Sequence, residues 1–159
     1  ALACGLADLP GVRIVVAGRL TGAAAARLVT RPNVHFLGKL PNAEALAQYR
    51  ASDVVLTLYD PSLPINRLAE PNKWGDCVAL GTPFIVNSEV VTARPYLEAG
   101  AAFAYPYADT AALVALCKEL AGAPDRLARA REALHGLARA QSSFEQQYEQ
   151  LVLPAVTRP

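Results

Sequence analysis

Three polar side chains at the start of a predicted helix could bind a phosphorylated sugar. We expect this helix to begin at Pro71 or Asn72 and to end at Gly81, because Pro suits a first helical position, Asn caps well and Gly accepts the left-handed closing conformation. The first turn presents unpaired amide hydrogens and a partial positive charge, to which Lys73 adds a full charge, and this combination suits a phosphate. Asp76 lies four residues after Asn72 on the same face, where its carboxylate can accept hydrogen bonds from a sugar diol. In the alternative interpretation, Asp76 points to solvent and pairs with Lys73.

Short apolar stretches alternate with helical patterns along the chain. The expected strands are 12–17, 34–37, 54–58, 83–86 and 101–105, and the expected helices are 23–29, 42–50, 72–80, 109–122, 124–140 and 142–153. Residues 1–9 resemble the tail of a helix, Pro95 predicts a short or broken helix around it, and Asn42, and Asp109 or Thr110, are expected helix caps. The strands are apolar on both faces, which is typical of a parallel sheet covered by helices on both sides. The pattern therefore predicts an α/β, Rossmann-like fold with a helical C-terminal tail.

The loops after residues 37, 58 and 86 should meet at one edge of this sheet, because the carboxyl ends of parallel strands lie together. Ligands of such folds bind in the crevice at that edge. The loop from residue 59 to residue 71 is polar and contains several prolines, so we expect irregular structure there that serves binding rather than packing.

Composition and charge exclude several classes of protein. The 159 residues suffice for one domain, expected over 1–159, and 53% of them are hydrophobic. A net charge of +1 with mixed signs gives no footprint for nucleic acid, and no apolar run is long enough to span a membrane. Cys4, Cys77 and Cys117 are widely spaced, which favours free thiols in a reducing cytosol. We find no catalytic triad pattern and no metal-ligand spacing.

The stretch AEPNKWGDCVALGTPFIV resembles the helix and strand of the donor domain in retaining GT-B glycosyltransferases. That family carries the pattern S-P-x-K-x-x-E-Y-x-A-x-G-x-P-V-I, on which the following residues fall: Pro71, Lys73, Asp76, Ala79, Gly81, Pro83 and Ile85. The segment NVHFLG at 33–38 is similar to the family's N-V-x-F-L-G strand and turn, and Asp53 begins a stretch similar to its A-D-V…P-S strand. Together these matches cover residues 12–90 in the family's order.

The resemblance implies which residues contact the nucleotide sugar. Gly38 and Lys39 would lie near the base, Lys73 at the diphosphate and Asp76 at the ribose diol. The implied contacts in full are Gly38, Lys39, Asn66, Arg67, Glu70, Pro71, Asn72, Lys73 and Asp76. No catalytic residue, metal or cofactor is implied; helix N–H groups and a lysine would do the work of a cation.

The sequence also departs from the family's pattern. An acidic residue usually precedes the helix acid by eight positions, which would place it on Leu68; Glu70 could substitute for it, or the site is altered. Asp76 is one methylene shorter than the usual Glu. Gly18-Arg19 imitates the family's G-R, but it lies only 14 residues before NVHFLG. We therefore expect the family's first strand and helix, with its G-R and Lys, ahead of residue 1.

The resemblance implies the carboxy-terminal half of an enzyme that transfers a sugar, with retention, from a nucleoside diphosphate sugar to a glycan, lipid or small-molecule acceptor held by an amino-terminal domain. It further implies bacterial polysaccharide biosynthesis in the cytoplasm, with at most peripheral contact to the inner face of a membrane. This chain alone should bind a nucleotide weakly and transfer nothing. Two alternatives stay open: a non-catalytic donor domain, which Leu68 and Asp76 favour, and a GT-B-like nucleotide-sugar epimerase, for which we find no acid/base pair.

Overall fold

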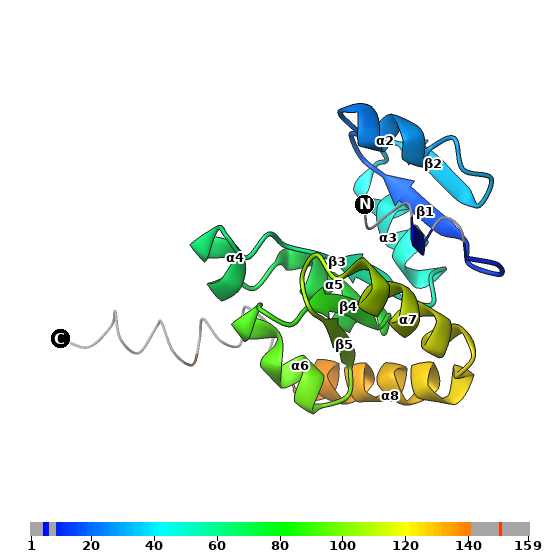
Figure 1. Cartoon of the computed structure of the whole chain (residues 1–159). Helices are drawn as coiled ribbons and strands as arrows, with labels where there is room; N and C mark the ends of the chain where they lie inside the picture. The colour runs from blue at the N-terminus through cyan, green and yellow to red at the C-terminus, as the bar shows by residue number, and fades with distance from the viewer. Residues whose placement is uncertain (1–4, 7–8, 141–149, 151–159) are drawn as a thin grey trace.

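The fold alternates parallel strands with helices, as the sequence predicts. The computed structural model describes residues 5–6, 9–140 and 150 (Figure 1). Its strands are β1 (Ile14–Ala17), β2 (Val34–Gly38), β3 (Val55–Thr57), β4 (Phe84–Asn87) and β5 (Ala102–Tyr105). Its helices are α2 (Ala23–Leu28), α3 (Asn42–Arg50), α4 (Pro64–Leu68), α5 (Asn72–Leu80), α6 (Arg94–Glu98), α7 (Thr110–Ala121) and α8 (Pro124–Ala140), with a 3₁₀ turn η1 (Val91–Ala93) before α6.

The strands form two parallel sheets rather than the single sheet expected. β1 pairs with β2, and β3, β4 and β5 pair in that order. Figure 1 shows β1 and β2 set apart from the other three strands. In the described part of the chain, no strand hydrogen-bonds to the edge of β1 that faces away from β2 or to the edge of β3 that faces away from β4, so the two sheets stay separate.

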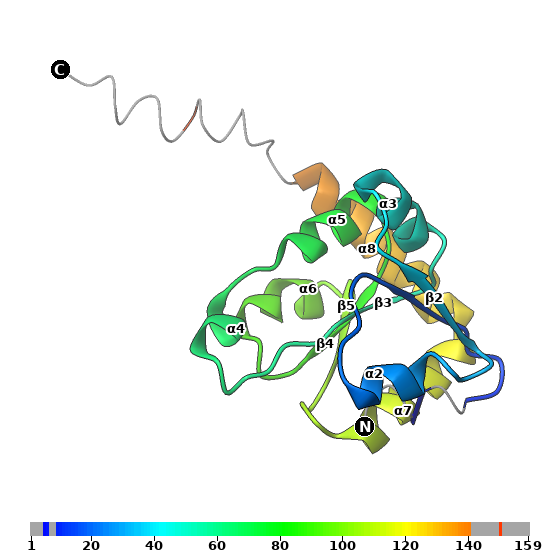
Figure 2. The same ribbon diagram turned by 90° about the horizontal axis from the view of Figure 1, so that it is seen from above.

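Helices cover both faces of the three-stranded sheet. On one face α5 and α6 pack on β4, where the rings of Trp74, Phe84 and Tyr96 lie 5.4–5.6 Å apart. On the other face α7 packs on Ile85 and Phe103. α8 contributes to both clusters, so it passes from the α7 layer to the α5 layer, as the view from above also shows (Figure 2).

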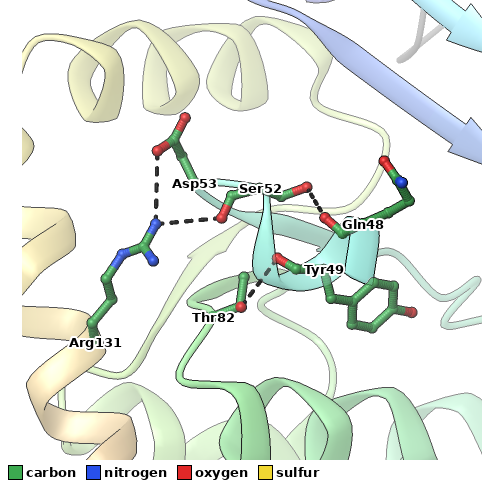
Figure 3. Close-up of polar contacts among 6 residues, drawn as sticks. All are labelled: Gln48, Tyr49, Ser52, Asp53, Thr82 and Arg131. Carbon is green, nitrogen blue, oxygen red and sulfur yellow. Dashed lines mark hydrogen bonds and ion pairs between the residues drawn. The ribbon is translucent and has the colours of Figure 1, made fainter. Parts of the chain in front are cut away.

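The end of α3 is held against α8 and the start of β4, at the edge opposite the predicted ligand site (Figure 3). The Arg131 guanidinium donates to the Ser52 carbonyl oxygen at 3.3 Å and lies 3.7 Å from an Asp53 carboxylate oxygen. Nearby, the Thr82 hydroxyl donates to the Tyr49 carbonyl oxygen at 3.1 Å. These contacts fix α3, which connects the two sheets.

Helix boundaries agree closely with the sequence, but the predicted caps at Asn42 and Asn72 are wrong. Pro41 and Pro71 occupy the cap positions instead, with ψ of 152° and 140°, because an extended proline already leads into the first turn. The predicted cap at Asp109 is confirmed, since its carboxylate accepts the Ala112 N–H at 2.8 Å.

Two further expectations concern segments around the core. The loop 59–71 is not wholly irregular, because α4 forms within it, starting with a proline at its first position. The helix expected over 142–153 lies outside the described residues, apart from residue 150. No helix in the described part of the chain is both long and apolar enough to cross a membrane.

Candidate functional site

The first turn of α5 is open at the carboxyl edge of the sheet. α5 leaves β3 and returns to the parallel strand β4, so its start lies at the edge where both strands end. Pro71 is extended and its carbonyl oxygen accepts the Trp74 N–H at 2.9 Å, while no side chain caps the helix. Asn72 and Lys73 are exposed. Amide hydrogens and a cation therefore face outward where an anion can reach them.

A buried hydrogen-bond chain fixes this turn to the sheet. The indole N–H of Trp74 donates to the Thr57 hydroxyl at 3.0 Å, and that hydroxyl donates to the Ile85 carbonyl oxygen at 3.0 Å. Trp74 is completely buried. The start of α5 is thus held by β3 and β4 together, and its amides are preorganised rather than free to shift.

Asp76 lies one turn further along α5 and is half-buried. The alternative interpretation was that Asp76 pairs with Lys73, but no ion pair joins these two side chains among the described residues. Burial raises the pKa of Tyr49 on α3, and the charges of Cys77 and Asp76 raise it further. Burial, and then the charge of Asp76, raises the pKa of the Cys77 thiol to about 12, so this cysteine is a packing residue rather than a nucleophile.

The residues predicted before α5 differ in how far their side chains are already engaged. The Asn66 amide on α4 donates to the Asp60 carbonyl oxygen at 2.9 Å, so it holds its own loop. Glu70, although exposed, accepts a hydrogen bond from the Tyr96 hydroxyl. Arg67 is exposed and carries a charge on the last turn of α4. The position at which the family's acid is expected, Leu68, is 66% exposed and apolar.

Gly38 and Lys39 lie at the carboxyl end of β2, in the other sheet. Gly38 has φ of +66° and no atom within 4 Å of where a Cβ would stand, so backbone conformation and not crowding calls for glycine there. Lys39 is exposed. The predicted residues on α4 and α5 therefore follow one another along the segment 66–76, whereas Gly38 and Lys39 lie on a separate sheet from them.

Sequence reasoning missed a polar junction at the same edge. Asn87 is completely buried at the end of β4; its amide oxygen accepts the Tyr59 N–H at 2.9 Å and its amide nitrogen donates to Glu89 at 3.1 Å. The Glu89 carboxylate accepts the Tyr107 N–H at 3.0 Å. Burial alone would raise the pKa of Glu89, but the hydrogen bonds from Tyr107 and Asn87 outweigh it and hold the pKa below its usual value. The sequence could have indicated this junction, because the polar run Asn87-Ser88-Glu89 stands at the end of a buried strand.

Hollows elsewhere on the surface do not involve the predicted residues. One of about 420 Å³ is lined by residues 9–12 and 31–33, and one of about 410 Å³ by Leu97, Ala99, Gly100, Ala102, Phe103, Arg126 and Arg129. Among the described residues, no three His, Cys, Asp or Glu side chains gather closely enough to hold a metal ion. The chemistry that this edge offers is anion binding by amides and Lys73, with a carboxylate one helical turn away.

The chain resembles known proteins in its fold and in its family. The chain is similar to the crystal structure of WaaG, a glycosyltransferase involved in lipopolysaccharide biosynthesis, with 19% sequence identity and a TM-score of 0.67. The match covers 93% of this chain and 40% of the WaaG chain, and at this identity it shows the fold alone. No curated protein sequence matches significantly. The family model described as glycosyl transferase-like matches residues 1–152, and the chain therefore belongs to that family.

Proposed function

We propose that the chain is the donor half of a GT-B glycosyltransferase and binds a nucleoside diphosphate sugar at the start of α5. The observation that carries the proposal is the uncapped first turn of α5 at the carboxyl edge, with Lys73 exposed beside it. The amides of that turn receive the diphosphate, and Lys73 adds a charge-assisted contact. Asp76, one turn on, accepts hydrogen bonds from the ribose diol.

The remaining contacts follow the same edge. Gly38 and Lys39 bind near the base, because the open backbone at Gly38 lets a flat ring approach. Pro71 and Asn72 shape the phosphate turn, and the loop with Asn66, Arg67 and Glu70 meets the sugar. No metal or cofactor is needed in this scheme, since helix N–H groups and Lys73 stabilise the negative charge of the leaving diphosphate.

The whole protein would transfer the sugar, with retention, to a glycan, lipid or small-molecule acceptor held by an amino-terminal domain. The chain spans 40% of the WaaG chain that it matches, which leaves room for such a domain in proteins of this kind. We place the enzyme in bacterial polysaccharide biosynthesis, in the cytoplasm, with at most peripheral contact to the inner face of the membrane. By itself this chain would bind a nucleotide weakly and transfer nothing.

Isothermal titration with UDP, GDP and ADP tests the donor site. Lys73→Ala should weaken binding of the preferred nucleotide by about tenfold, the lower end expected for losing one charge-assisted contact at an exposed site. Asp76→Ala should weaken it by a similar factor, whereas Lys118→Ala, which removes an exposed lysine on α7, should leave it unchanged. If Asp76→Ala binds as tightly as the parent, the role assigned to that carboxylate is wrong.

One observation favours a second candidate, a non-catalytic donor domain kept for binding or assembly. The position of the family's expected acid is the exposed Leu68, and the nearby Glu70 is already bonded to Tyr96. Sugar transfer by the full-length gene product, measured with radiolabelled donor and membrane extract, separates the two. Binding of nucleotide without turnover would support the non-catalytic function, and turnover would exclude it.

A further inference from the structure

Two side chains from η1 and α6 hold the segment that leads into α5. The Thr92 hydroxyl donates to the Ala69 carbonyl oxygen at 2.8 Å, and the Tyr96 hydroxyl donates to the Glu70 carboxylate. The two acceptors belong to consecutive residues, directly before the Pro71 that opens α5. These bonds join residues 23 and 26 positions apart, so tertiary contacts rather than a local turn fix the approach to the helix.

The ring of Tyr96 is held firmly in the core. Tyr96 is 5% exposed, and its ring packs edge-on against the rings of Trp74 and Phe84, with centroids 5.6 and 5.4 Å away. Its hydroxyl therefore stands at a fixed point. Glu70 is exposed, and a glutamate without a partner would sample several rotamers. The hydrogen bond from Tyr96 thus decides where the charge of Glu70 lies.

The place of this charge matters because Glu70 stands directly before the first turn of α5. The first two amides of the helix, those of Asn72 and Lys73, have no acceptor within a helix, and no side chain caps them. A carboxylate is a favourable acceptor at a helix start, where its charge also meets the positive end of the helix dipole. Released from Tyr96, the long side chain of Glu70 could turn toward these amides.

We propose that Tyr96 is a positioning residue of the donor site, which holds the Glu70 carboxylate away from the first turn of α5. The amides of that turn then stay accessible to the diphosphate of a nucleotide sugar. This inference rests on the proposed function, since it concerns the site in which α5 receives the diphosphate. Tyr96 itself touches no substrate and acts only through Glu70.

A carboxylate in the first turn would oppose the diphosphate in two ways. It would occupy the same amide donors, and it would repel the negative charge of the phosphate groups. Held by Tyr96, the Glu70 carboxylate keeps lone pairs that the tyrosine does not use, and these accept hydrogen bonds only from donors such as sugar hydroxyls. The tether therefore separates a turn that binds an anion from a neighbouring group that rejects one.

Tyr96→Phe tests the tether, because it removes the hydroxyl and keeps the ring in its packing. A side-chain acceptor favours the capped state of a helix start by about fivefold. A site that is accessible in only part of the molecules loses apparent affinity in proportion. Isothermal titration of the complete gene product with UDP, GDP and ADP should therefore show a Kd about fivefold higher in Tyr96→Phe than in the parent, for the nucleotide that the parent prefers. An unchanged Kd would overturn the proposal and leave the donor site itself intact.

Removal of the carboxylate separates positioning from a structural defect. Tyr96→Phe combined with Glu70→Ala should bind the nucleotide as tightly as Glu70→Ala alone, because no competing carboxylate remains. A fivefold loss that persists in the double variant would show that Tyr96 acts on the fold and not through Glu70. Tyr105→Phe is the matched control: Tyr105 is 2% exposed, its hydroxyl has no partner among the described residues, and its loss should leave the Kd unchanged.

Amide hydrogen exchange measures the same effect without a nucleotide. The Asn72 and Lys73 amides should exchange about fivefold more slowly in Tyr96→Phe than in the parent, because Glu70 caps them there. Adding Glu70→Ala should restore the exchange rate of the parent. Equal rates in the parent and Tyr96→Phe would overturn the proposal. If no nucleotide binds the parent, the proposed donor site fails, and the exchange rates still decide whether Tyr96 keeps Glu70 off the helix start.

Discussion

Removal of the Thr57 hydroxyl should destabilise the protein by stranding the indole N–H of Trp74. That N–H donates to the hydroxyl at 3.0 Å, and Trp74 is 0% exposed, so water cannot replace the lost partner. An unpaired buried donor costs about 1–3 kcal/mol, and we expect Thr57→Val, which keeps the side-chain shape, to cost about 2 kcal/mol. Thr57→Ser keeps the hydroxyl and loses one methyl group, for about 1 kcal/mol.

The chain reports this change itself, because Trp74 is its single tryptophan. Urea unfolding followed by tryptophan fluorescence should rank the wild type above Thr57→Ser and Thr57→Ser above Thr57→Val. For a chain of this size the Val variant should also melt about 4–8 °C lower. If Thr57→Val is as stable as Thr57→Ser, the hydrogen bond does not hold the start of α5, and the preorganisation argued for that turn fails.

Three other predictions concern the junction and the packing around α5. Folding lowers the pKa of Glu89, so its ionised form stabilises the protein above the unfolded pKa, and this contribution is lost on acidification. The wild type and Glu89→Gln should therefore differ less in their free energy of unfolding, measured by urea titration, as the pH falls from about 5 to about 3. Gly81→Ala should lower the free energy of unfolding by about 2–3 kcal/mol, because φ is +65° and the added Cβ would lie 2.6 Å from His135 Cε1. In a His135→Ala background the same substitution should cost only about 1 kcal/mol. Equal costs in the two backgrounds would contradict the clash with His135. Cys77, with a pKa of about 12, should resist a thiol reagent at pH 8 until urea unfolds the chain, as peptide mass spectrometry can show; rapid labelling of the folded protein would refute this.

Local signals in the sequence were sufficient for most elements. The bounds of α5 agree with the predicted 72–80 because Gly81 adopts the left-handed conformation that closes a helix. β4 and β5 were predicted within a residue, since short apolar runs bounded by turns leave little choice. α4 was missed because five residues are too few for a periodic pattern to emerge.

Long-range relations could not be read in the same way. The bond from Tyr96 to Glu70 joins residues 26 apart, and the Asn87 contact to Tyr59 joins residues 28 apart, so no local spacing announces either. The motif around α5 predicted a helix that begins near Asn72, and the structure has that helix, with Lys73 exposed in its first turn. The division of the sheet was not foreseen, because strand pairing depends on which edges meet and not on the composition of each strand.

The buried amide of Asn87 has a mechanical consequence. It ties Tyr59, two residues after β3, to the residues after β4, and through Glu89 to the segment after β5. The loops after β3, β4 and β5 are therefore held together by hydrogen bonds rather than free to move separately. A ligand that displaces one of these loops must therefore also move the other two. Ligand binding at any one loop would then affect the whole carboxyl edge of the sheet.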